Sequence, residues 1–520
     1  MVCFLKRNDY IMKNLNNLGH KFTEALSVAV SRQDSVISER QRSKKVHVTG
    51  AGRTLTFAYE QLRNAAEYAE DHLLQYAIKR FYNRVFLSRD GELVKNSGEE
   101  LIVELTMAGY LQNDTVNTDT IVQINNLAFD YYNSQLKYGR DSWGLDILSV
   151  EVEQLLLINL KRDIFAHFVY EYFLKIINPK KAIGYKVQNF EILLFVAVYR
   201  ILFKFDDSAV RSVILKRYQQ KPSLSSFRQT NEMIDKVLVS KSLDKITRLV
   251  NRQSAPFRIL WKMVDRDQDV KQLFNSRENF LSLFKQQIDN EYGQIEKRIN
   301  KGIIKSVIFL IITKILIGIA IEVPYDFAMK GVVSWLPLTI NLLFPPIFMV
   351  LLRFTLQLPS NANEQSLIEI VDNLIYGDDQ SIAISKQPRA GLGTKFNIAY
   401  ALFSVLVFGG IALLLYSIGF EWLHLIVFYV FLSAASFLGF RLSRIIREVE
   451  IGEGQQSGIA IVRDFFYLPF VIVGRWISEK YAQVNIVALI LDVVIELPLK
   501  TILHLIRQWG IFIANKKDEI

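Results

Sequence analysis

The chain of 520 residues carries 62 Lys and Arg against 52 Asp and Glu, a formal net charge of +10, and half of its residues are hydrophobic. Its length leaves room for two or three domains. A single cysteine, Cys3, excludes an intramolecular disulfide and fits a reducing compartment. The first residues contain no apolar core followed by a small-residue cleavage site, so we expect no signal peptide there.

Residues 1–300 are predicted to form one large α-helical domain on the cytoplasmic side. Between residues 55 and 87, apolar side chains recur in steps of three and four, the period of an amphipathic helix with one buried face. No alternating strand pattern of useful length is present. The run Phe190–Phe205 is apolar almost all round, but it is too short to span a membrane and contains Glu191 and Arg200. We therefore predict a buried central helix there.

The stretch 159–262 holds 20 basic and 8 acidic side chains. Such a charge excess is typical of surfaces that face anionic lipid headgroups or nucleic acid. The alternative is a solvated helical surface on which the charges cluster without a partner. Lipid is favoured over nucleic acid because the domain would be tethered beside an anionic leaflet.

Residues 301–441 are predicted to form a transmembrane region. Four apolar runs occupy about 303–321, 332–352, 396–420 and 422–440, and a loop at 353–395 separates the second from the third. A helix needs about 20 apolar residues to cross the hydrocarbon core. A buried helix of a soluble protein could imitate one such run, but hardly four within 140 residues. The sequence thus predicts a multi-pass integral membrane protein that is all-α throughout.

Basic residues flank these runs unevenly. They precede the first run, occupy the loop after the second and follow the fourth: Lys297, Arg298, Lys301, Lys305; Arg353, Lys386, Arg389, Lys395; Arg441, Arg444, Arg447. The remaining two connections carry only Lys330. By the positive-inside rule, both termini and the central loop are predicted to be cytoplasmic. In a prokaryote, the membrane would be the plasma (inner) membrane.

Lys314, about half-way along the first run, is the leading candidate for an intramembrane polar site. A charge there costs about 2.5–3.5 kcal/mol on insertion scales, so the side chain should face other helices or a cavity. The second run offers a polar break, because Asn341 carries an amide and Pro345 and Pro346 remove two backbone donors. Lys314 would then either line a pathway or pair with a carboxylate only to hold the bundle together.

Small residues suit close contact between the third and fourth runs. Gly409 and Gly410 lie in the third, and the fourth carries Ser433, Ser436 and Gly439. Packing of these two helices against each other explains the small residues without a functional role.

Residues 442–520 are predicted to form amphipathic, membrane-associated helices. Four polar residues at four-residue spacing form one narrow stripe on an otherwise apolar segment: Asp492, Glu496, Lys500 and His504. Such a helix either lies in the membrane interface or packs against the bundle. A membrane-buried proton relay is the alternative interpretation of the stripe.

Sequence motifs exclude several chemistries. The stretch 49–54 lacks the third glycine of a dinucleotide fingerprint and the Gly-Lys-Ser/Thr of a phosphate-binding loop. The stretch beginning at Asp265 lacks the glycine and glutamate that a calcium loop requires at its sixth and twelfth positions. The six histidines are scattered, so we expect no metal site, cofactor or catalytic residue.

Three function classes remain. The first is a non-enzymatic membrane-tethered scaffold or regulator whose helical domain binds a cytoplasmic protein or the leaflet. The second is a transporter or channel that uses Lys314 and the broken second span. Because four spans are few for a monomeric carrier, it would require a homo-oligomer. The third, a membrane-embedded lipid-modifying enzyme, is weakest because no carboxylate pair or histidine cluster lies at a span boundary.

Overall fold

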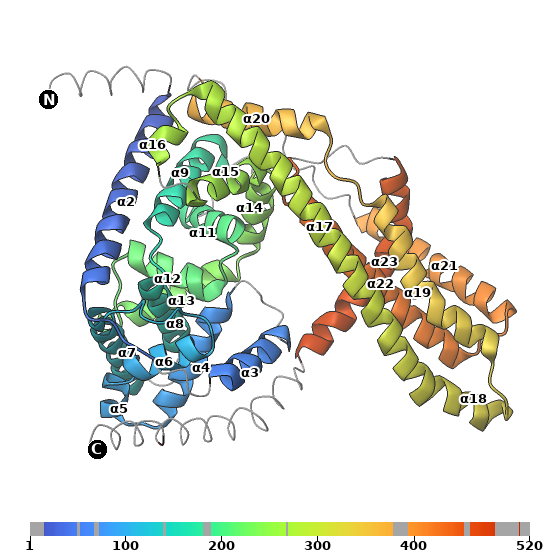
Figure 1. The fold of residues 1–520 in the computed structure, drawn as a ribbon. Coiled ribbons are helices and arrows are strands. Elements are labelled where there is room, and N and C mark those ends of the chain that lie inside the picture. The colour runs from blue at the N-terminus through green and yellow to red at the C-terminus, as the bar shows by residue number, and fades with distance from the viewer. Residues whose placement is uncertain are drawn as a thin grey trace. The chain divides into compact units, whose positions relative to one another are not determined.

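The computed structural model describes residues 15–48, 53–66, 72–138, 142–179, 189–266, 269–377, 394–451, 458–483 and 509 (Figure 1). These residues form an all-α structure in which no strand occurs, as predicted. They divide into two compact units. The N-terminal unit comprises mainly 20–250, and the membrane-helix unit comprises mainly 251–267 and 272–484, together with the segment 15–19.

The N-terminal unit is built from helices of 5 to 26 residues. They are α2 (Asn17–Arg42), α3 (Arg53–Ala66), α4 (Leu73–Leu87), α5 (Gly91–Lys95), α6 (Gly98–Met107), α7 (Thr118–Tyr138), α8 (Ser142–Leu156), α9 (Leu160–Ile176), α11 (Phe190–Phe203), α12 (Asp207–Arg217), α13 (Phe227–Leu238) and α14 (Lys241–Asn251). Side-chain caps at Asp90, Asn159 and Asp206 begin α5, α9 and α12. Helix α11 is buried over most of its length, which confirms the predicted central helix.

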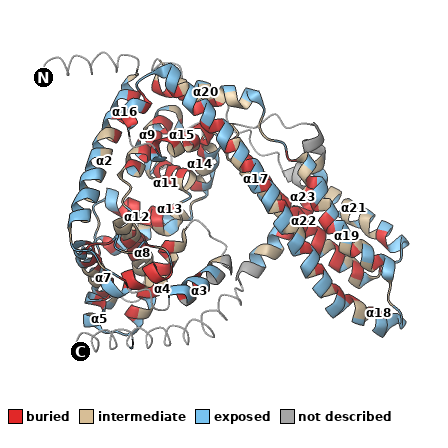
Figure 2. Ribbon diagram, in the orientation of Figure 1, coloured by how far each residue is buried: buried red, intermediate tan, exposed pale blue. Residues whose placement is uncertain are grey.

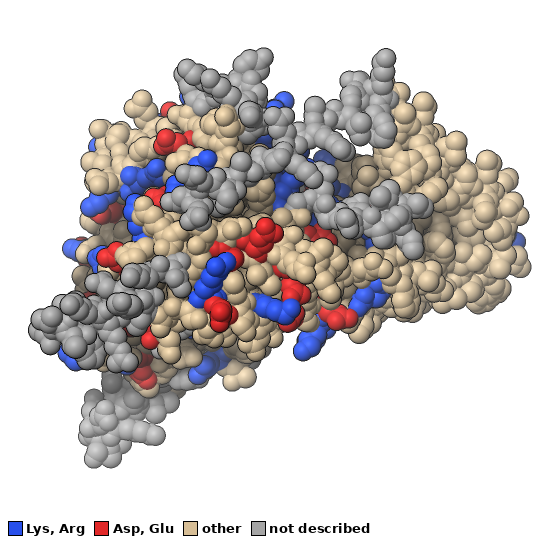
Figure 3. Space-filling model, turned by 90° about the horizontal axis from the view of Figure 1, so that it is seen from above, with Lys and Arg blue, Asp and Glu red and all other residues tan. Residues whose placement is uncertain are grey.

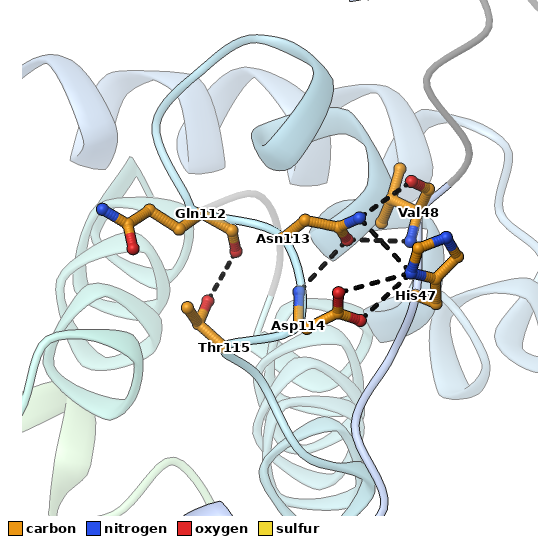
Figure 4. A network of polar contacts seen from close by, with 6 residues as sticks. All are labelled: His47, Val48, Gln112, Asn113, Asp114 and Thr115. Carbon is orange, nitrogen blue, oxygen red and sulfur yellow. Dashed lines mark hydrogen bonds and ion pairs between the residues drawn. The ribbon is translucent and has the colours of Figure 1, made fainter.

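One extended connection of this unit is fixed by side-chain hydrogen bonds that resemble strand pairing (Figure 4). The Asn113 amide accepts from the Val48 N–H at 2.9 Å and donates to the Val48 carbonyl at 3.1 Å. His47 lies 3.2 Å from the Asp114 carboxylate, and the only bridge among the described residues joins Lys45 to Asn117. This histidine and its carboxylate are largely exposed, so the contact anchors a loop.

The membrane-helix unit contains the longest helix of the described residues, with 41 residues. Its elements are α15 (Ala255–Arg266), α17 (Arg277–Ile317), the π-helix Gly318–Glu322, α18 (Val323–Lys330), α19 (Trp335–Thr355), α20 (Asn361–Ile375), α21 (Thr394–Ser417), α22 (Trp422–Arg447) and α23 (Gly458–Gln483). The short α16 (Val270–Leu273) lies at the boundary between the units.

Four helices among the described residues are long and apolar enough to cross a membrane: Arg277–Lys330, Trp335–Thr355, Ile398–Ser417 and Trp422–Arg447. Their outer faces carry large apolar side chains in open contact with the surroundings; Leu413, for example, is 73% exposed (Figure 2). On the face drawn in Figure 3, the end formed by these helices shows almost no charged side chain. An apolar surface of this extent is costly in water and favourable in lipid, which indicates an integral membrane protein.

Helix α17 continues without interruption across the domain boundary predicted at 300/301. Its first half buries Phe280, Phe284 and Ile288, and it is joined to α20 by ion pairs from Arg277 to Asp372 and from Lys285 to Glu364. Its second half is the first apolar run. The helical path then extends beyond the expected end at residue 321, through the π-helix and α18.

The second span is not broken, contrary to the sequence-based hypothesis. Helix α19 runs from Trp335 to Thr355 with Pro345 and Pro346 inside it. Each proline removes one backbone hydrogen bond, but membrane helices tolerate this loss where neighbouring helices and side chains satisfy the freed groups. Both prolines are buried, on the side of α19 that packs within the protein.

The small face of α22 does not pack against α21 as expected. No atom of the described residues lies within 4 Å of the position that a Cβ would take at Gly409 or Gly410. Instead, a Cβ added at Gly474 of α23 would lie 2.1 Å from the Ser433 carbonyl oxygen, and one at Gly439 would lie 2.8 Å from Leu352 of α19. The small residues therefore let α23 and α19 approach α22 closely. The sequence did not identify α23 as a helix that packs against α22, because Pro469 and Arg475 interrupt the apolar run of α23.

Candidate functional site in the membrane helices

The candidate site lies where the end of α17, the π-helix, α19 and the start of α22 meet. In an α-helix, residues eight apart differ by about 80° around the axis, so residues 314 and 322 would not share a face. The π-helix Gly318–Glu322 widens one turn between them. This wider turn takes up much of the rotation, and single π turns are frequent at functional sites.

Lys314 and Glu322 form a buried ion pair. The Lys314 ammonium donates to one carboxylate oxygen of Glu322, and the two side chains are 2% and 0% exposed. The ammonium also lies 5.0 Å from the centre of the Phe431 ring, which adds a cation–π contact from α22. In the structure, Lys314 thus pairs with a carboxylate inside the bundle and does not face the lipid.

Asn341 holds the second oxygen of Glu322. Its side-chain amide donates to that oxygen and to the backbone carbonyl of His424, both at 3.2 Å. The residue is fully buried, and its own amide oxygen has no hydrogen-bond partner among the described residues. One side chain of α19 therefore joins the π-helix to the first turn of α22.

Of the residues predicted for this site, Lys314 and Asn341 are brought together through Glu322. Pro345 lies one turn beyond Asn341 on α19, Pro346 follows it, and neither contributes a side-chain donor or acceptor. Sequence reasoning placed Glu322 at the end of the span and missed its role. Its spacing of eight from Lys314 matches no α-helical pair, so only the π turn reveals it.

A second polar group adjoins the first at the same end of the bundle. His424 Nε2 lies 3.4 Å from a carboxylate oxygen of Asp326, and Lys330 lies 3.2 Å from Glu421. The backbone N–H of Ser334 donates to the other oxygen of Asp326 at 2.7 Å. Because Asn341 bonds the His424 carbonyl, the two groups are continuous. Neither Asp326 nor His424 was singled out from the sequence, since they come from separate helices.

The predicted C-terminal polar stripe, Asp492, Glu496, Lys500 and His504, lies outside the described residues. Its interpretation as an interface helix or a proton relay stays a prediction.

The arrangement of Lys314, Glu322 and Asn341 balances charge in a low-dielectric environment. Removing one member of such a pair typically destabilises a protein by about 3–5 kcal/mol, because the remaining charge is left buried without its counterion. Ionisable residues within membrane spans also mark ion pathways in many proteins. The contact geometry is therefore compatible with a structural clamp and with a conducting site, and a stability measurement separates the two.

Lys314→Leu is expected to lower the thermal stability of the detergent-solubilised protein, because Glu322 loses its counterion while remaining buried. Lys305→Leu on the exposed side of the same helix serves as the matched control and should leave the melting temperature nearly unchanged. Thermal unfolding followed by intrinsic fluorescence measures both. A Lys314→Leu protein as stable as the wild type would show that the ion pair does not hold the bundle.

Comparison of the chain with protein-family models, with curated proteins and with solved structures yields no match. Its function is inferred from the contacts described above.

Proposed function

We propose that the protein is a non-enzymatic membrane-anchored scaffold or regulator, in which the N-terminal unit binds a cytoplasmic protein. The observation that carries this proposal is the continuity of α17. Its first half packs with α15 and α20, and its second half packs with α19 and α22. A helix without a break holds α15 and α20 in a fixed position relative to the membrane helices of the same unit, and the N-terminal unit is tethered to this anchor by the chain that enters it at Asn251.

The charges inside the bundle support the same proposal. Lys314, the one Lys or Arg in the apolar run 306–321, is neutralised by Glu322, whose second oxygen is occupied by Asn341. A carrier that releases an ion or solute needs binding groups that exchange partners. Here the buried donor and acceptor are engaged with each other, as expected of a clamp.

The orientation that we propose places the N-terminal unit, α20 and the C-terminal region in the cytoplasm. It is supported by the basic residues at the cytoplasmic ends of the spans, including Arg353 in the last turn of α19 and Arg444 and Arg447 at the end of α22. Arg353 is also fixed at this end, because it donates to Asn300 of α17 at 2.6 Å.

Anionic lipid is a second proposed partner of the cytoplasmic side. The stretch 159–262 has a formal excess of twelve positive charges, from 20 basic and 8 acidic residues. Several of these cations are engaged internally, such as Arg211 with Asp235 and Arg200 with Asp207, so the charge available to a membrane is smaller than the formal value. Attraction to a leaflet should accordingly weaken as salt rises.

A transporter or channel is the second candidate function, and one observation favours it. Lys314, Glu322 and Asn341 form a fully buried polar contact that continues to Asp326 and Glu421 near the end of the bundle. Polar residues in such a line could pass a proton or ion. This candidate requires a homo-oligomer, and the uninterrupted α19 removes the broken span on which the sequence-based version depended.

The orientation is tested with single cysteines in a Cys3→Ser background. Met329→Cys replaces an exposed residue of α18, between the first two spans, and Gln365→Cys replaces an exposed residue of α20, between the second and third. In intact cells, an impermeant thiol reagent should label Met329→Cys, whereas Gln365→Cys should react only after permeabilisation. The opposite pattern would reverse the orientation, and equal labelling of both in intact cells would contradict the four-span topology.

The scaffold is tested by comparing the full chain with a variant that lacks residues 20–250. Proteins that co-purify with the full chain in mild detergent should be absent from the deletion variant, and full-chain liposomes should show no ion flux above empty liposomes. Sedimentation with anionic vesicles, compared at low and high salt, measures the lipid contribution separately. An ion flux that Glu322→Gln abolishes without loss of folding would contradict the scaffold and support the transporter.

A further inference from the structure

Three potential metal ligands converge at the end of the bundle where α18 meets the turn before α22. Asp326 lies in α18, Glu421 is the residue before α22, and His424 lies in its first turn. One ligand atom from each lies within 4.8 Å of the other two, the only such trio among the described residues. Asp326 and His424 are both fully buried.

In each carboxylate, one oxygen contacts a neighbouring donor or cation, and the other oxygen has no hydrogen bond to the described residues. Asp326 accepts the Ser334 N–H through Oδ2, and Glu421 meets Lys330 through Oε1. The opposite oxygens, Asp326 Oδ1 and Glu421 Oε2, are buried and have no hydrogen-bond partner in the described part of the chain. Contacts of this kind, in which a second group holds a ligand residue in place, are typical of metal centres.

The His424 ring is the independent observation that points to a ligand. Both of its nitrogens are buried and form no hydrogen bond with any described residue, although Nε2 lies 3.4 Å from Asp326 Oδ1. If His424 and Asp326 served only to attract each other, an imidazole N–H would point at the carboxylate oxygen and form a hydrogen bond with it. Here the two atoms are close, but they lack hydrogen-bond geometry. One ligand atom of each residue thus lies within 4.8 Å of the others, and each residue has a buried polar atom without a hydrogen bond to the described residues. Such unsatisfied polar atoms are rare in proteins.

The spacing suits a metal ion between these atoms. Two ligands that each lie about 2.1 Å from a tetrahedrally coordinated ion are about 3.4 Å apart. The separation of His424 Nε2 from Asp326 Oδ1 has this value. The ligand atom of Glu421 lies within 4.8 Å of the other two, and its neighbour Lys330 is a flexible side chain that is 33% exposed.

We propose that Asp326, Glu421 and His424 bind one divalent transition-metal ion of the Zn²⁺ class. One imidazole and two carboxylates form a nitrogen and oxygen ligand set, which suits Zn²⁺ and excludes the all-oxygen cages of Ca²⁺ and Mg²⁺. Three protein ligands leave a fourth position for water. The partial exposure of Glu421 and Lys330 gives the ion a way in from the surface.

The bound ion would tie α18 to the first turn of α22. Figure 1 shows α18 at the end of the long helical path that begins with α17, next to the start of α19. The metal would therefore lock the end of the bundle opposite α20, independently of any partner of the N-terminal unit. This role goes beyond the scaffold proposed above, and its failure would leave that proposal intact.

The test uses the full chain in detergent, stripped of metal with a chelator and then titrated with Zn²⁺. Bound metal is counted by elemental analysis, thermal stability is followed with and without Zn²⁺, and Co²⁺ absorption in the visible range reports tetrahedral nitrogen and oxygen ligands. The variants are Asp326→Asn, Glu421→Gln and His424→Gln. The matched control is His167→Gln, which alters an exposed histidine that pairs with Glu171 at 3.1 Å in α9.

We expect one Zn²⁺ per chain and a higher melting temperature with Zn²⁺ for the wild type and for His167→Gln. Asp326→Asn and His424→Gln should weaken binding at least tenfold, and Glu421→Gln should weaken it measurably. Lys330→Met removes a cation beside a ligand, so Zn²⁺ should bind equally or more tightly. Because this variant keeps all three ligands, its Zn²⁺ affinity still tests the site even where a ligand variant fails to fold.

Two results would overturn the proposal. The first is wild-type protein that takes up no Zn²⁺ beyond the level of a protein-free detergent control. The second is binding that all three ligand variants retain in full, because the ion would then lie elsewhere.

Discussion

The buried ion pair between Lys314 and Glu322 is the interaction on which the membrane helices depend. A lone charge in hydrocarbon carries an insertion cost of about 2.5–3.5 kcal/mol, and a counter-charge within the bundle offsets it. The counter-charge comes from the same helical path, eight residues later, through a π turn. The local geometry at the end of α17 thereby determines the position at which α19 needs a polar side chain.

That polar group is Asn341. It bonds Glu322 and the His424 carbonyl, and it thereby fixes α19 and the start of α22 around the pair. Buried polar contacts restrict helix packing more strictly than apolar ones, because each donor must meet its acceptor. The small residues Gly439 and Gly474 complement this by allowing α19 and α23 to approach α22. The result is a bundle with a specified arrangement, to which α17 joins α15 and α20.

The sequence predicted much of this fold because hydrophobic periodicity and run length are local properties. Four spans, the all-helical class and the buried helix at Phe190 followed from them. The prediction of a broken second span was wrong, since Pro345 and Pro346 are tolerated inside α19 by tertiary packing. The ion-pair partner of Lys314 was missed because a π turn changes the spacing at which two residues share a face of a helix. No sequence pattern predicted that turn.

The group at Asp326, Glu421 and His424 was missed for a different reason. Its members lie in two separate segments, and their proximity is created by the packing of α18 against the start of α22. Single-sequence reasoning searches for ligands at fixed spacing and therefore favours sites on one helix or loop. Sites assembled from distant residues become visible only when the helices have been placed.

Exchange of the two charges tests the central claim most directly. The variant that combines Lys314→Glu with Glu322→Lys keeps one positive and one negative side chain in the same buried space, whereas each single change puts two like charges there. If the ion pair stabilises the bundle, the exchanged protein in detergent should recover a substantial part of the thermal stability that either single variant loses. Single variants as stable as the wild type, or an exchanged protein as unstable as the sum of the two single losses, would contradict this claim.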